Sequence, residues 1–157
     1  MKKTTLISVP AIFISFCLCI VVLAGDHGQK APKKVGILLV AFGSSQPDAQ
    51  VSFENIDKNT RAAFPGIPVH WAYTSHIIRK KLAKQGTHLD SPEVALAKMQ
   101  DEGFTHVAVQ SLHTIGGAEY HDLRRTVGAF KAMGGFQRII LGYPLLATQE
   151  DMQLAVA

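Results

Sequence analysis

The sequence predicts an α/β domain built on a doubly wound, mostly parallel sheet of about four strands. Its first strand is expected at 35–42, where VGILLVAF is a continuous apolar run without alternation. Such a run is typical of a strand that is buried on both faces, as in a parallel sheet. From there onward, short apolar segments alternate with segments of helical pattern. This alternation indicates parallel strands joined by right-handed helical crossovers.

Ordinary start and stop signals bound the other elements. Further strands are expected at 69–73, 106–110 and 136–142, and helices from about 47 to 64, at 75–86, 91–103 and 118–133, and from about 148. Ser91 is the expected N-cap of the third helix, which Gly103 ends. In the first helix, Val51, Ile56 and Ala63 are expected to face the core.

The segment before the domain has the pattern of a secretory signal. Lys2 and Lys3 precede an uncharged apolar run from Leu6 to Leu23, and small Ala24 stands before Gly25. We therefore expect a cleaved signal peptide at 1–24 and a periplasmic protein. An uncleaved membrane anchor is the alternative, because about 20 apolar residues can span a bilayer. A linker at 25–34 and an α/β domain at 35–157 complete the expected division of the chain.

Composition excludes several classes of function. The chain is 47% hydrophobic and 18% charged, as in a globular protein. Loss of residues 1–24 removes Lys2 and Lys3 and lowers the formal net charge from +4 to +2. No basic stripe interleaved with aromatic residues occurs, so no nucleic-acid partner is expected. Cys17 and Cys19 are the only cysteines, and both lie in the expected signal. A disulfide, a thiolate metal site and a cysteine nucleophile are therefore not expected in the mature domain.

The candidate site lies in the loop after the third strand, within QSLHTIGGAEYH at 110–121. In open α/β sheets, ligands bind outside the carboxyl ends of the strands. The neutral imidazole of His113 can there accept a proton or bind a divalent metal, although it can also serve only to hold its loop. Gly116 and Gly117 permit a positive φ or a close approach of backbone to ligand. Glu119 can contact a ligand or simply suit the helix N-terminus.

Two other loops reach the same edge. Ser44 and Ser45, in FGSS at 42–45, offer hydroxyls and amides to an anion, although an ordinary capped turn fits equally well. Neither a dinucleotide fingerprint nor a P-loop pattern is present. The segment TSHIIRKK at 74–81 places Thr74 at the edge and Arg79 in the following helix, where Arg79 can meet a carboxylate. The alternative for these basic residues is a solvated helix face.

Five blocks of the sequence, LLVAFGSS, AYTSHIIRKKL, DSPEVALAKMQDEGF, VAVQSLHTIGGAEYHDL and LGYPLLATQEDM, resemble anaerobic sirohydrochlorin cobaltochelatases in order and spacing. These class II chelatases insert cobalt into a tetrapyrrole without ATP. The resemblance implies that His113 takes the pyrrole protons and ligates the metal. It further implies that Co²⁺, or Fe²⁺, is a substrate, that no cofactor is required, and that a tetrapyrrole such as sirohydrochlorin is the partner. The residues expected to bind this substrate are Ser44, Ser45, Arg79, Gly116, Gly117 and Glu119.

The resemblance covers residues 35–157 and corresponds to the N-terminal half of the long family type. That type is bilobal, and its second domain supplies a glutamate and another histidine to the metal site. The second family domain is expected to be absent from this chain. A homo-oligomer in which two copies of His113 face one cleft is therefore expected. Export favours an alternative, a periplasmic tetrapyrrole- or metal-binding module, and an inactive truncated half-domain is a third reading.

Overall fold

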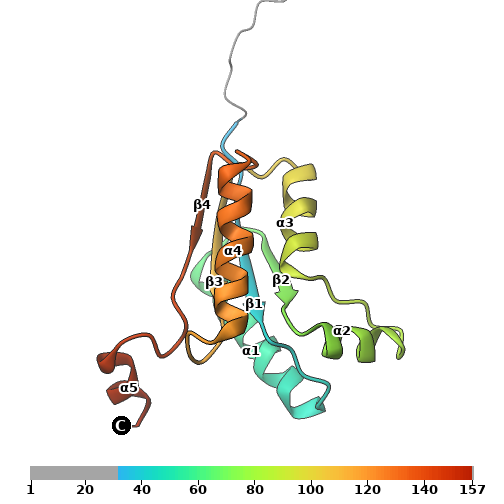
Figure 1. The fold of residues 1–157 in the computed structure, drawn as a ribbon, viewed down its shortest axis with the longest axis vertical. Coiled ribbons are helices and arrows are strands. Elements are labelled where there is room, and N and C mark those ends of the chain that lie inside the picture. The colour runs from blue at the N-terminus through green and yellow to red at the C-terminus, as the bar shows by residue number, and fades with distance from the viewer. Residues whose placement is uncertain (1–31, 157) are drawn as a thin grey trace, which may run out of the picture. The chain divides into compact units, whose positions relative to one another are not determined.

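A four-stranded sheet organises residues 32–156, the part of the chain that the computed structural model describes. The strands are β1 (Val35–Ala41), β2 (Val69–Tyr73), β3 (His106–Ser111) and β4 (Arg138–Leu141). They lie in the order β2-β1-β3-β4, and every neighbouring pair is parallel (Figure 1). The predicted α/β class and its parallel four-stranded sheet are thus confirmed. The expected signal at 1–24 and most of the linker at 25–34 lie outside the described residues.

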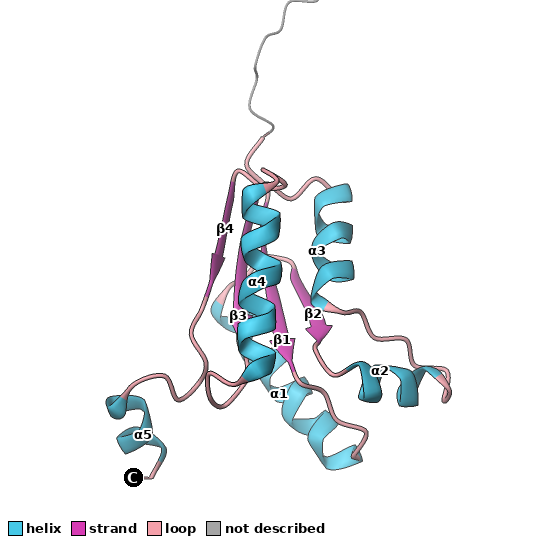
Figure 2. Ribbon diagram, viewed as in Figure 1, coloured by secondary structure: helices cyan, strands magenta, loops and turns pink. Residues whose placement is uncertain are grey.

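Five helices accompany the sheet. They are α1 (Pro47–Ala63), α2 (His76–Ala83), α3 (Pro92–Asp101), α4 (Ala118–Ala132) and α5 (Gln149–Ala155). Helices α3 and α4 lie side by side over one face of the sheet, and α1 lies behind it (Figure 2). Within residues 32–156, none of these helices is long and apolar enough to cross a membrane.

Strand β1 is buried on both faces because alternate side chains enter two separate cores. Leu38 and Val40 pack with residues of α3 and α4, and both are fully buried. Ile37 and Leu39 point the other way and pack with Ile56 of α1. The unbroken apolar run that predicted a central parallel strand therefore reflects two faces, each covered by its own helix or helices.

Helix α1 differs from the prediction in the face that it buries. Ile56 packs against the core as expected, but Val51 is 56% exposed and Ala63 is also exposed. Val51 lies five residues before Ile56, which turns it about 140° away around the helix. Ala63 belongs to the last turn of α1, just before the chain leaves the helix.

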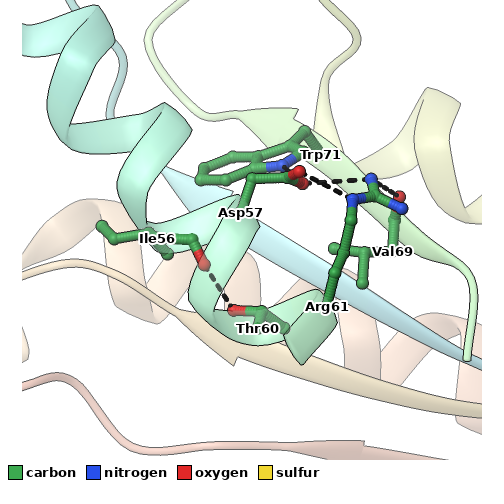
Figure 3. A network of polar contacts seen from close by, with 6 residues as sticks. All are labelled: Ile56, Asp57, Thr60, Arg61, Val69 and Trp71. Atoms are coloured by element: carbon green, nitrogen blue, oxygen red, sulfur yellow. Dashed lines mark hydrogen bonds and ion pairs between the residues drawn. The ribbon is translucent and has the colours of Figure 1, made fainter. Parts of the chain in front are cut away.

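Polar contacts, rather than a fully apolar stripe, attach the second half of α1 to β2 (Figure 3). Asp57 accepts a hydrogen bond from Trp71 Nε1 at 2.8 Å and two from Arg61, at 2.6 and 3.0 Å. Arg61 Nη2 also donates to the carbonyl of Val69 at 3.0 Å. The helix is thereby fixed to the first half of the edge strand β2, at Val69 and Trp71.

Candidate functional site

The loops that follow the four parallel strands meet at one edge of the sheet, below the arrowheads in Figure 1. Backbone hydrogen bonds hold these loops together. Thr74 N–H donates to the carbonyl of Ala41 at 2.9 Å, and Ser75 N–H donates to that of Phe42 at 3.1 Å. Leu145 N–H, after β4, donates to the carbonyl of His113 at 2.9 Å. The edge is therefore a connected surface, with His113 near its centre, as the topology predicted.

His113 is held by a hydroxyl at each ring nitrogen. Nδ1 lies 2.9 Å from Ser111 Oγ, and Nε2 lies 3.2 Å from Thr74 Oγ1. Ser111 is the last residue of β3 and is fully buried, and its Oγ also accepts the backbone N–H of His113 at 3.3 Å. Nδ1 thus faces the protein interior, whereas Nε2 points along the edge toward the end of β2. Among residues 32–156, hydroxyls and no carboxylate contact the two ring nitrogens.

Burial lowers the pKa of His113 below its usual value, and the negative charge of Glu119 offsets part of that effect. A half-buried imidazole is harder to protonate, because the charged form loses hydration. Near neutral pH the ring is therefore neutral. A neutral imidazole has a free lone pair that can accept a proton or coordinate a divalent metal.

An open hollow of about 280 Å³ adjoins His113. It lies between the loop after β3 and the first turn of α4, and it is lined by Phe42, Leu112, His113, Thr114, Ile115, Gly117, Ala118, Glu119 and Tyr120. Gly117 and Glu119 therefore line the same hollow as His113, whereas Gly116 does not; their binding of substrate stays a prediction. Of the two alternatives left open for these glycines, neither Gly116 nor Gly117 adopts a positive φ. No atom lies within 4 Å of a Cβ built on Gly117, so a ligand can approach its backbone closely.

Large apolar side chains are exposed around this hollow. Phe42 is 48% exposed, Ile115 62%, Leu145 51% and Tyr143 77%. All four belong to loops that follow strands, not to the far end of the sheet. An exposed apolar group gathered beside a polar residue is typical of a ligand or interaction site. This part of the edge can therefore contact apolar groups of a ligand beside His113.

The two serines predicted to bind substrate have partners within the protein. Ser44 Oγ accepts the backbone N–H of Gln46 at 3.1 Å, and Ser45 Oγ accepts a hydrogen bond from Lys81 Nζ at 3.0 Å. Neither serine lines the hollow beside His113. Their geometry is that of a turn that precedes a helix, the alternative that the sequence left open. Both remain at the carboxyl edge, in the loop after β1.

Arg79 also lies away from the hollow. Burial raises the pKa of Glu93, but hydrogen bonds from Ser91 and Thr126 and the positive charge of Arg79 lower it overall. The charge of Arg79 therefore acts on Glu93 in the first turn of α3. Arg79 itself is half-buried. Its Nε is buried and has no hydrogen-bond partner among the described residues. The predicted contact of Arg79 with a substrate carboxylate stays a prediction.

Sequence reasoning placed Thr74 at this edge but did not connect it with His113, and it missed Ser111. A serine at the end of a buried apolar strand was the available signal for Ser111, because a fully buried hydroxyl needs a partner. Between residues 32 and 156, no group of three or more His, Cys, Asp or Glu side chains could hold a metal ion. His113 and Glu119 are the candidate metal-binding groups that line the hollow.

Residues 35–157 match the family model described as cobalt chelatase (CbiK). The sirohydrochlorin cobaltochelatase CbiKC of Nitratidesulfovibrio vulgaris is 48% identical over 124 residues, which are 79% of this chain and 44% of the relative. The sirohydrochlorin cobaltochelatase of Salmonella typhimurium is 36% identical over 120 residues, 75% of this chain and 45% of the relative. The chain thus spans less than half the length of these curated relatives.

A solved structure from Marinobacter aquaeolei, described as a cobalamin (vitamin B12) biosynthesis CbiX protein, has a similar fold. Its TM-score is 0.53 at 20% sequence identity, and the match covers 78% of this chain and 90% of that one. At this identity the likeness shows the fold alone.

Proposed function

Because this chain belongs to the cobalt chelatase (CbiK) family, we propose that it inserts Co²⁺ into sirohydrochlorin without ATP. The two curated relatives carry the name of this activity and are about twice as long as the matched region. The family supports the reaction type, and the site described above supports the residues that perform it. Fe²⁺ is the alternative substrate metal.

Metal insertion exchanges two pyrrole protons for one divalent ion. The tetrapyrrole loses two N–H protons as Co²⁺ forms bonds to its nitrogens, so the products are the metallated ring and two protons. A base must take these protons, and a ligand must hold the ion as it loses water. Imidazole suits both tasks, because it is basic near neutral pH and is a good ligand for first-row divalent metals.

The observation that carries the proposal is the setting of His113. Its imidazole is half-buried, is positioned by hydroxyls at both nitrogens, and lines an open hollow at the carboxyl edge of a parallel sheet. The lowered pKa of His113 keeps the ring neutral and ready to accept a proton or bind a metal. The exposed Phe42 and Ile115 offer apolar contact to the face of a macrocycle.

The outer groups of the tetrapyrrole have candidate partners at the same edge. In the proposed complex, Gly117 and Glu119 lie closest to the ring, because both line the hollow. Ser44, Ser45, Gly116 and Arg79 are proposed to lie farther out, toward the carboxylates of the ring. For Ser45 this requires exchange of its hydrogen bond from Lys81.

Self-association forms part of the proposal. In the described part of the chain, His113 and Glu119 have no third metal-binding side chain with them. A second copy that opposes the same edge would bring a second His113, and the exposed Tyr143 and Leu145 would lie in that contact. Sedimentation of the chain with and without tetrapyrrole would measure its oligomeric state. A monomer at all concentrations, combined with full activity, contradicts the proposal.

The protein is proposed to act in the periplasm, supported by the signal-like pattern of residues 1–24. That location favours a second candidate function, a module that binds a tetrapyrrole or metal without turnover.

A turnover assay separates the two functions. The purified chain is incubated with sirohydrochlorin and Co²⁺, and the absorbance of the metallated ring is followed beside the His113→Ala and His88→Ala variants. His88 is an exposed loop histidine and serves as the matched control. We expect multiple turnovers in wild type and His88→Ala and none above the spontaneous rate in His113→Ala, with similar melting temperatures. Binding without turnover in wild type would favour the binding module.

A further inference from the structure

One side of α2 forms a basic surface, and its lysines have no role in the function proposed above. His76, Ile77, Lys80, Lys81 and Lys84 line an open hollow of about 370 Å³ on this helix. Residues spaced by four along a helix lie on the same side of it, which explains why these five share one surface. We call this set of five residues the α2 basic face.

The positive charge of the α2 basic face is not neutralised within the protein. In the described part of the chain, no carboxylate forms an ion pair with Lys80, Lys81 or Lys84. Helix α2 itself contains no acidic residue. The neighbouring Asp90 is already paired, with Lys98 at 2.7 Å. Lysines clustered in this way repel one another, and an anionic ligand relieves that repulsion.

The start of α2 is connected to His113 through Thr74 and Ser75. Thr74, which contacts Nε2 of His113 at 3.2 Å, is followed directly by Ser75, the N-cap of α2. Ser75 N–H is bonded to the carbonyl of Phe42, and Phe42 lines the hollow next to His113. Lys81 Nζ reaches Ser45 in the loop after β1. The helix is therefore held to the loop after β1 at both its start and its middle, and Phe42 of that loop lines the hollow beside His113.

We propose that the α2 basic face binds peripheral carboxylates of the tetrapyrrole and guides the ring toward His113. This inference rests on the proposed function and deepens it, because it assigns a binding surface to the charged rim of the substrate. The positive charges of the lysines are complementary to the negative charges of a carboxylate-rich rim. Ile77, 66% exposed among them, offers contact to its methylene groups. Opposite charges at an open surface raise the association rate and make it depend on salt.

The test uses a double variant, Lys80→Gln with Lys84→Gln, in the full chain. Both side chains are exposed, so their replacement leaves the core intact. The matched control is Lys58→Gln with Lys131→Gln, two exposed lysines on α1 and α4 that lie outside the α2 basic face. The probe is uroporphyrin, a carboxylate-rich tetrapyrrole, and its Kd is measured by fluorescence titration at low and high salt.

We expect the Kd of the double variant to rise roughly 3- to 30-fold at low salt, with a smaller difference at high salt because ions screen exposed charges. The control variant should bind as wild type does. Equal binding by the double variant and the control would overturn the inference. An equally large loss of uroporphyrin affinity at high salt would also overturn it. Binding to vesicles of anionic phospholipid is measured in parallel. If the double variant loses only vesicle binding, the face belongs to a membrane contact and the inference fails.

Failure of this inference is distinguishable from failure of the proposed function. The titration reads binding alone, in the absence of metal and turnover. If wild type binds uroporphyrin through Lys80 and Lys84 but inserts no Co²⁺, the α2 basic face stands and the chelatase assignment fails. If turnover depends on His113 while the lysine variants bind normally, the assignment stands and this inference fails.

Discussion

Ser111 Oγ lies 2.9 Å from Nδ1 of His113, and it reaches the ring from a fully buried position at the end of β3. This contact decides which nitrogen of His113 is free for chemistry. With Nδ1 turned into the protein, Nε2 is the nitrogen available at the carboxyl edge. When Nδ1 carries the proton and donates it to Ser111, the lone pair of neutral imidazole lies on Nε2.

Removal of this hydroxyl should weaken activity without unfolding the protein. In Ser111→Ala, Nδ1 loses its hydroxyl partner, so neither the tautomer nor the ring orientation of His113 is held. Comparable supporting groups typically contribute 10- to 100-fold in activity or metal affinity, and we expect a loss of about this size. Steady-state kinetics, with nitrogen NMR of the imidazole, measure the effect. A wild-type tautomer and rate in Ser111→Ala would contradict this role, and Ser111→Cys should retain part of the activity.

Thr74→Val tests the other hydroxyl. Thr74 Oγ1 lies 3.2 Å from Nε2, the nitrogen that must be released before it can bind metal or accept a proton. Because this contact is broken in the reacting complex, its loss should cost less activity than Ser111→Ala. Valine keeps the shape of threonine, so the packing beside Ser75 is conserved. Kinetics of the two variants measured side by side give the comparison, and an equal or larger loss in Thr74→Val would reverse the assigned roles.

The charge of Glu119 should set part of the pH dependence of His113. Burial lowers the pKa of this histidine, and Glu119 raises it part of the way back. Glu119→Gln removes the attractive charge, so the pKa of His113 should fall further and the neutral ring should persist to lower pH. NMR titration of the metal-free chain reads the pKa directly. Glu54→Gln, at an exposed position of α1, is the control and should leave it unchanged.

The contact of Asp57 with Arg61 and Trp71 should make the free energy of unfolding depend on pH. Hydrogen bonding from Arg61 lowers the pKa of Asp57, burial opposes this, and Trp71 lowers it further. The ionised carboxylate therefore stabilises the fold above its unfolded-state pKa, and this contribution is lost as pH falls through the lower folded-state value. We expect Asp57→Asn to reduce the free energy of unfolding by about 1 kcal/mol at pH 7. Denaturant unfolding at pH 7 and pH 3 measures this, and the difference in unfolding free energy between wild type and Asp57→Asn should be smaller at pH 3.

Gly36 lies at a position where β1 packs closely against its covering layer. A Cβ at this position would lie 2.7 Å from Met99 Cε and 2.7 Å from the ring of Phe104. Gly36→Ala should therefore destabilise the fold by about 1–3 kcal/mol, the usual effect of overpacking. Gly128→Ala is the control: no atom lies within 4 Å of its Cβ in α4, so alanine should stabilise that helix by about 0.5–1 kcal/mol. Denaturant unfolding measures the change in unfolding free energy of each variant. Equal changes in the two variants would contradict the packing argument.

Local patterns were sufficient to predict the architecture. The apolar run of β1, the caps of the helices and the glycines after them all act within a few residues, and the strands and helices lie close to their predicted positions. Helix α3 begins after Ser91, whose side chain accepts the N–H of Val94. The position of His113 after a buried strand was likewise predictable, because the carboxyl ends of parallel strands meet at one edge.

The sequence by itself determined the fold class, the order of the elements and the edge at which His113 lies. The tertiary structure alone decided what His113 touches. Thr74 is 39 residues away along the chain and meets His113 only because β2 and β3 both flank β1. Packing likewise placed Arg79 near Glu93 and brought Lys81 to Ser45, 36 residues away along the chain. Contacts between distant side chains depend on how several elements pack at once, and no local pattern of residues specifies them.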